Sequence, residues 1–219
     1  MNLRHIRYLL TIFLLFLLLS CAGSSPQARL PNSRLPDDCW LLQPAVYRLR
    51  QSAKLEYQNK QEMLEGFMEL DLKQKRAHLV IFNPLGLTLL NIEVEPHAYK
   101  LVEASTDLKN QPPPDRRKQQ FAEMVATAVQ HIFFSLESYR ETFADRRSQA
   151  VTEFSGKPPR LTKISADRQD PTWTVTYHDY DQGKVHRLPK RIILQNRKPD
   201  YRLTLWLHKA KLIKEVVRE

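Results

Sequence analysis

Glycine is scarce in this chain, with five residues among 219. None stands in a Gly-x-Gly-x-x-Gly or phosphate-loop arrangement, so nucleotide binding has no support. The Gly-x-Ser-x-Gly elbow of many hydrolases is absent as well. Missing motifs do not exclude catalysis, but nothing in the sequence favours it. We predict a protein that is not an enzyme, with no catalytic residues and no cofactor.

Metal-binding patterns are also lacking, because none of the seven histidines has His-x-x-x-His spacing. The nearest approach is the run His178 to Asp181 together with His186, in an expected hairpin loop. Mixed polar residues in a turn are usually solvated, so we predict no metal site.

No apolar run in the sequence is long enough to span a bilayer stably. The longest extends from Tyr8 to Leu19 and contains one polar residue, Thr11. As a helix these residues would be only about 18 Å long, against a hydrocarbon core of about 30 Å. Arg4 and Arg7 precede the run, and this arrangement is typical of a secretory signal.

Leu18-Leu19-Ser20-Cys21 closes this segment and resembles the lipobox of bacterial lipoproteins. The resemblance implies cleavage before Cys21 and lipid attachment to it, which gives stable anchoring when two or more chains are present. An ordinary signal peptide with a chance cysteine is the alternative. Ala22 occupies the position where an Asp would retain a lipoprotein in the inner membrane, so the periplasmic face of the outer membrane is favoured.

Cysteine is limited to Cys21 and Cys39, so lipidation of the first leaves no internal disulfide to form. We expect Cys39 to be half-buried beside Trp40, with an intermolecular bridge as the alternative.

The net charge is +10, which becomes +8 when Arg4 and Arg7 are removed with the signal. Secretion makes anionic lipid or an acidic partner a better match for this charge than nucleic acid. Because the charges are dispersed, a solvated surface is the simplest explanation.

Three segments are predicted along the chain. Residues 1–20 form the signal peptide, and residues 21–38 form the lipidated cysteine and a flexible tether rich in Ser, Pro, Arg and Asn. Residues 39–219 form one domain, long enough to bury a sizeable core.

Alternating apolar residues between Val46 and Ala104 predict half-buried antiparallel strands. The stretch His78 to Phe82 has apolar residues on both faces and predicts a strand covered on each side. Apolar spacing from about Asp115 to Leu136 then predicts an amphipathic helix packed on the sheet. Five further strands are expected: 150–154, 161–166, 173–177, 188–194 and 201–207.

About ten strands and one helix predict a mainly β fold. We expect a curled antiparallel sheet or incomplete β-barrel, with a helical lid across its concave face and an apolar cavity between them. The expected lining residues are Met68, Leu70, Leu72, Leu90, Ile92, Val94, Val125, Val129, Ile132 and Phe133.

Two segments carry a family resemblance: Asn83-Pro84-Leu85-Gly86 after the strand from Leu79, and Trp173-Thr174-Val175-Thr176-Tyr177 followed by Tyr180-Asp181. Together with Leu188-Pro189, the last strand and the lipobox, they resemble the LolB family of outer-membrane lipoprotein receptors. The resemblance implies an incomplete barrel whose cavity takes acyl chains of lipoproteins from a periplasmic LolA-like carrier. It also implies that Leu85 protrudes and helps to pass those chains to membrane lipid.

Residues 110–158 depart from the family pattern, and they form the predicted lid. The chain is also similar in general character to lipoproteins encoded beside aryl polyene biosynthesis genes, which would imply a polyene lipid as cargo. A different class of function is an envelope assembly protein with a filled core that binds another protein. A lipid hydrolase is a third hypothesis.

Overall fold

The computed structural model describes residues 39–104, 114–136, 151–157, 159–166, 171–180 and 188–215. All of them belong to one compact unit, Pro36–Glu219. The predicted signal peptide, Cys21 and the predicted tether lie outside the described residues.

Strands come first in the chain. After a short 3₁₀ turn, η1 (Trp40–Leu42), the first five are β1 (Ala45–Tyr57), β2 (Lys60–Asp71), β3 (Arg76–Phe82), β4 (Thr88–Glu95) and β5 (Ala98–Ala104). The helix α2 (Pro114–Val129) follows and continues into a π-helical turn, η2 (Gln130–Phe134). The remaining strands are β6 (Val151–Ser155), β7 (Arg160–Ser165), β8 (Trp173–Tyr180), β9 (Pro189–Arg197) and β10 (Asp200–Glu215).

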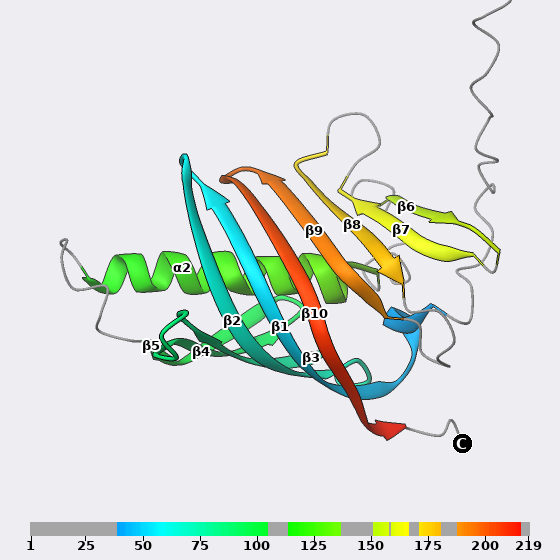
Figure 1. The fold of residues 1–219 in the computed structure, drawn as a ribbon, viewed down its shortest axis with the longest axis horizontal. Helices are drawn as coiled ribbons and strands as arrows, with labels where there is room; N and C mark the ends of the chain where they lie inside the picture. Colours follow the sequence, from blue (N-terminus) through cyan, green and yellow to red (C-terminus); the bar gives the residue numbers. More distant parts are fainter. Residues whose placement is uncertain are drawn as a thin grey trace, which may run out of the picture. The chain divides into compact units, whose positions relative to one another are not determined.

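These ten strands form a single antiparallel sheet in the order β5-β4-β3-β2-β1-β10-β9-β8-β7-β6. Each half of the chain is a meander, and the first and last strands join the two halves at the centre (Figure 1). The edge strands β5 and β6 do not pair with each other in the part of the chain that the structure describes. The predicted mainly β fold, with an antiparallel sheet that is not closed and a helix across it, is confirmed.

Helix α2 stands between the two edge strands in the sequence, so it crosses one face of the sheet (Figure 1). It packs most closely on β4 and β5, and η2 contacts β9. Pro114 opens the helix, a position where its missing N–H has no intrahelical partner to lose. The helix predicted from about Asp115 is confirmed, whereas the π-helical turn was not foreseen.

Buried and exposed residues alternate along the strands, so one face of the sheet is buried and the other is exposed, as predicted. In β2, Leu64, Gly66, Met68 and Leu70 are buried, and the residues between them are exposed. Leu90, Ile92 and Val94 in β4 are 0% exposed.

The outer face of β3 departs from its prediction. His78 is exposed, and Val80 and Phe82 are only half-buried, so this strand is not covered on both sides as expected. Phe82 instead packs edge-on against Phe67 of β2 with ring centroids 6.0 Å apart, and Phe67 remains 50% exposed.

Candidate functional site

An apolar pocket lies between the helical segment and the inner faces of β1, β2, β3 and β10. It holds about 590 Å³ of empty space, part of which is open to solvent. Because every second side chain of a strand faces the same side, the sheet supplies most of the wall. The sheet residues are Gln51, Ala53, Leu55, Leu64, Glu65, Gly66, Met68, Leu79, Ile81, Tyr201, Leu203 and Leu205, and the helical ones are Phe121, Met124, Val125, Ala128, Val129, Ile132 and Phe133.

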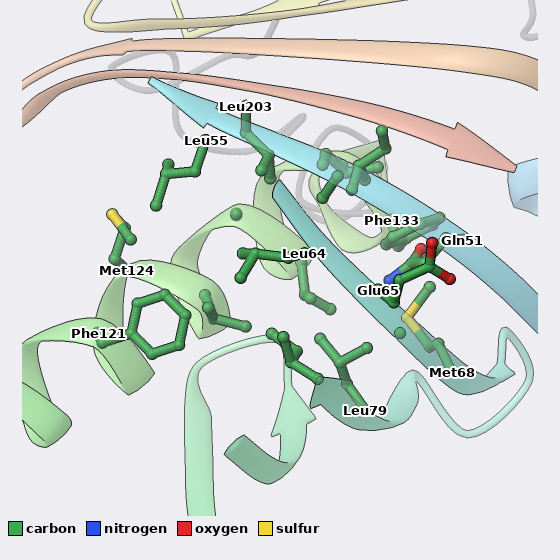
Figure 2. Close-up of a pocket in the computed structure, with 18 of the residues that line it drawn as sticks. Gln51, Leu55, Leu64, Glu65, Met68, Leu79, Phe121, Met124, Phe133 and Leu203 are labelled. Atoms are coloured by element: carbon green, nitrogen blue, oxygen red, sulfur yellow. The ribbon is translucent and has the colours of Figure 1, made fainter. Parts of the chain in front are cut away.

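The two ends of the pocket differ in exposure. Phe121 and Met124 of the helix and Leu203 of β10 are half-buried and mark the open end (Figure 2). Met68 and Phe133 are 1% and 3% exposed, and they lie toward the other end. The pocket therefore runs inward from the tips of the β1–β2 and β9–β10 hairpins toward η2.

Five of the predicted lining residues surround this pocket: Met68, Val125, Val129, Ile132 and Phe133. The other five, Leu70, Leu72, Leu90, Ile92 and Val94, are buried but do not line it. The β4 residues Leu90, Ile92 and Val94 do not reach the pocket because α2 packs directly on β4 and covers its inner side chains. Leu70 and Leu72 lie beyond the deep end of the pocket, where β2 ends. Leu70 pairs there with Tyr47 of β1, and Leu72 follows the last residue of β2.

Two polar residues border the pocket. Glu65 belongs to the surface, since its carboxylate lies 3.9 Å from the guanidinium of Arg50 and its side chain is 48% exposed. Gln51 is only 6% exposed. The sequence analysis did not single out Gln51. It could have done so, because Gln51 is the one amide among the alternate residues of β1 that face inward.

The π-helical turn is attached to the sheet by a buried hydrogen bond. The Tyr177 hydroxyl of β8 donates to the carbonyl oxygen of Ile132 over 2.7 Å, and burial raises the pKa of that hydroxyl well above its usual value. Phe133 packs edge-on against Trp40, with ring centroids 6.0 Å apart. Single π turns are frequent at functional sites. Here the turn holds the deep end of the pocket against β8.

His131 lies in the same turn and stacks on the Trp173 ring, with centroids 4.2 Å apart and planes inclined by 14°. Burial lowers the pKa of His131 to about 4, because the cationic form would lose its hydration. The ring is therefore neutral at physiological pH.

Leu85 is held at the tip of a hydrogen-bonded turn between β3 and β4. The Asn83 side-chain oxygen accepts hydrogen bonds from the backbone N–H groups of Leu85 and Leu87, at 3.0 and 2.9 Å. Gly86 has φ of +82° and donates to the Asn83 carbonyl over 2.9 Å. Leu85 is 85% exposed. A role of this side chain in lipid transfer stays a prediction.

Other predicted positions fall as follows. Cys39, directly before Trp40 and the turn η1, is buried, deeper than the half-buried position expected. No group of three metal-ligating side chains occurs among the described residues; His178 lies in β8, and Asp181 and His186 are outside them. Within the described ranges, no helix is long and apolar enough to cross a membrane.

Comparison with known protein families identifies one match. The sequence model described as "Outer membrane lipoprotein LolB" matches residues 48–209. No curated protein matches the chain.

Solved structures show more distant similarity. A LolA superfamily protein from Nitrosomonas europaea is 10% identical with a TM-score of 0.47, over 81% of this chain and 91% of that one. A domain named as an outer membrane lipoprotein-sorting protein from Vibrio parahaemolyticus is 10% identical with a TM-score of 0.43, over 82% and 88%. A DUF1329 family protein from Desulfovibrio piger is 6% identical with a TM-score of 0.38, over 80% and 88%.

Proposed function

The chain belongs to the LolB family of outer-membrane lipoproteins, and from this premise we propose that its pocket accepts the acyl chains of a lipid or lipoprotein. LolB is a non-catalytic lipoprotein receptor at the periplasmic face of the outer membrane, in agreement with the location and the lack of catalysis predicted from the sequence. Acyl binding, the delivering carrier and the cargo are the parts that we propose.

The observation that carries the proposal is the composition of the pocket wall. Its members are almost all apolar, and they come from both the sheet and the helix. Removing an acyl chain from water to such a wall is favourable by about 25 cal/mol per Å² of apolar surface buried. A periplasmic LolA-like protein would deliver the chain, the lipid on Cys21 would hold the receptor at the membrane, and Leu85 would contact the bilayer. Cys21 lies in the proposed tether segment, residues 21–38, outside the described residues.

Mass spectrometry of an organic extract of the purified full-length protein tests this function. We expect co-purified lipid in the extract, and much less of it from Ala53→Phe, which places a ring in the pocket. Ala98→Phe is the matched control, because Ala98 is exposed at the start of β5. A thermal melt of both variants verifies folding.

The result also separates the alternatives. If no lipid is recovered from the native protein and it binds no added fatty acid, acyl acceptance is wrong and an assembly role with a filled core gains support. The nature of any lipid recovered would decide between lipoprotein acyl chains and a polyene cargo.

A further inference from the structure

The outer face of β2 and β3 carries an exposed apolar patch, which consists of Met63, Phe67, Val80 and Phe82. Met63 and Phe67 are each 50% exposed, although both lie within a strand of the sheet. Phe67 pairs directly with Val80, and Phe82 pairs with Glu65, which places Phe82 diagonally beside Met63 and Phe67. Single exposed apolar side chains are ordinary on a protein surface, whereas a contiguous patch indicates a contact surface.

This outer patch continues into the turn that carries Leu85. Phe82 is the last residue of β3, and the turn begins with the next residue, Asn83. Leu85 and Leu87 within the turn are 85% and 47% exposed. Exposed apolar surface therefore extends from the tip of the turn onto the outer face of the sheet, on the side away from the pocket.

Cationic side chains of β1 and β10 form a border along this outer patch. Arg50 pairs with Phe67 on one side and with Lys209 on the other, and all three side chains are exposed. Farther along the same strands, Arg48 pairs with Lys211. Like charges directly opposite each other weaken a sheet. Two such pairs side by side are therefore kept at some cost to stability.

The basic border keeps a net positive charge. Its two arginines each have an ion pair with a glutamate of β2, at 3.0 and 3.9 Å. Lys209 and Lys211 make no ion pair among the residues that the structure describes. The two lysines therefore provide the positive charge that an anionic surface would complement.

We propose that the outer patch and its basic border dock on the anionic lipid surface of the membrane that holds the protein. Aromatic side chains are enriched where membrane and water meet, and lysine and arginine are attracted to anionic headgroups. A stable protein partner is a poorer match, because such an interface takes roughly 20 to 30 residues from each side. This docking extends the bilayer contact proposed for Leu85, and it does not depend on acyl binding in the pocket.

Fluorescence quenching on the full-length protein, held in liposomes by its own anchor, tests the docking. The liposomes contain phosphatidylglycerol and a nitroxide-labelled lipid, and a fluorophore is attached through Gln61→Cys, which faces outward beside Met63. The control fluorophore is attached through Gln119→Cys, exposed on α2, which covers the opposite face of the sheet. Both are made with Cys39→Ala, so that no second thiol reacts. We expect quenching at position 61 to be several times stronger than at position 119.

A double variant tests the apolar part of this surface. Met63→Gln combined with Phe67→Gln leaves Leu85 in place, and should reduce quenching at position 61 to the level at position 119. Val102→Gln is the matched control and should change nothing, because Val102 is 49% exposed on the edge strand β5, outside the outer patch. All three substitutions are at exposed positions, and a thermal melt verifies that the variants fold.

The charged part is tested by Lys209→Gln combined with Lys211→Gln. Quenching of the native sequence should be stronger on phosphatidylglycerol liposomes than on phosphatidylcholine liposomes, and this double variant should remove the difference. Equal quenching of the native sequence on both lipids would show that the basic border has no such role.

Two results would overturn the docking as a whole. If the two fluorophores are quenched equally, or neither is quenched, this surface does not face the bilayer and is open to a protein partner such as the carrier. If quenching survives the loss of Met63 and Phe67, the turn with Leu85 makes the contact alone. Neither result changes the amount of co-purified lipid, so the docking and the acyl acceptance proposed above fail separately.

Discussion

Leu85 is an apolar side chain where a turn would normally carry a polar one. Because this side chain is exposed, it contributes little to the core, and the turn is held by backbone N–H groups that donate to the Asn83 side-chain oxygen. We expect Leu85→Glu to change the free energy of unfolding by no more than about 0.5 kcal/mol, as for other surface substitutions. Delivery of a bound lipid to liposomes should nevertheless be impaired, because a carboxylate does not enter the bilayer.

Leu79→Glu is the matched control for this prediction. Leu79 precedes the turn in β3 and is 3% exposed, so the same substitution there buries an unpaired charge and should destabilise the fold by several kcal/mol. Both unfolding in urea and lipid delivery are measured for each variant. A large loss of stability in Leu85→Glu, or normal delivery by it, would contradict the transfer role.

His131 makes stability depend on pH in a defined direction. Its pKa is about 4 in the folded protein and near 6.5 in an unfolded chain. Between these values the unfolded chain binds a proton that the folded protein does not, so stability is complete above about pH 6.5 and falls as the pH decreases toward 4. At pH 4.5 the loss should be on the order of 2 kcal/mol relative to pH 7.

His131→Phe isolates this contribution, since a phenyl ring can still stack on Trp173 but does not titrate. Carboxylates titrate in the same range, so the quantity to measure is the difference between the two proteins in urea unfolding at pH 7 and pH 4.5. Equal losses on acidification in both proteins would show that burial of His131 is not responsible.

The π-helical turn η2, like α2, packs on the sheet and lines the pocket. Ile132 is 1% exposed and lines the pocket, and its carbonyl oxygen is held by Tyr177. We expect Ile132→Asp to reduce stability by several kcal/mol, because it buries an unpaired carboxylate, or to abolish lipid binding if the segment moves as a lid. A thermal melt together with a fluorescent fatty-acid titration measures both effects.

Gln119→Asp provides the comparison on the exposed side of α2. It introduces the same carboxylate into the same helix, yet it should leave the melt and the titration nearly unchanged. If Ile132→Asp also leaves both unchanged, the packing of the helical segment over the sheet is not as described.

At the scale of the whole molecule, we propose that anchoring depends on a single cysteine, Cys21, which lies outside the described residues. We expect Cys21→Ala to prevent both lipid attachment and signal cleavage, so that labelled palmitate is not incorporated and the chain keeps its precursor size. Cys39→Ala is the control, because Cys39 is buried in the folded domain and has no lipobox before it. Palmitate incorporation into Cys21→Ala, or mature-sized protein from it, would rule out this anchor.

The positions of the strands and of the helix were determined by the sequence alone. Period two in Leu64 to Leu70 and helical spacing in Val125 to Phe133 are local properties, since each depends only on which side of its own element a side chain takes. The Asn83 to Gly86 turn is equally local. For this reason the fold class and the turn at Leu85 could be predicted before any contact was known, whereas the exposure of Leu85 was implied only by the resemblance to the LolB family.

Which buried residues surround a pocket was decided only by the tertiary structure. Pairing of β1 with β10 joins residues from opposite ends of the chain, and α2 packs on β4 and β5 of the sheet so formed. Ile92 and Met68 have the same inward pattern, yet the helix seals one and leaves the other beside open space. Likewise, nothing near Phe67 in sequence indicates that Arg50 and Lys209 lie beside it in the sheet. Periodicity selects a face, whereas position along that face depends on long-range packing that no local pattern encodes.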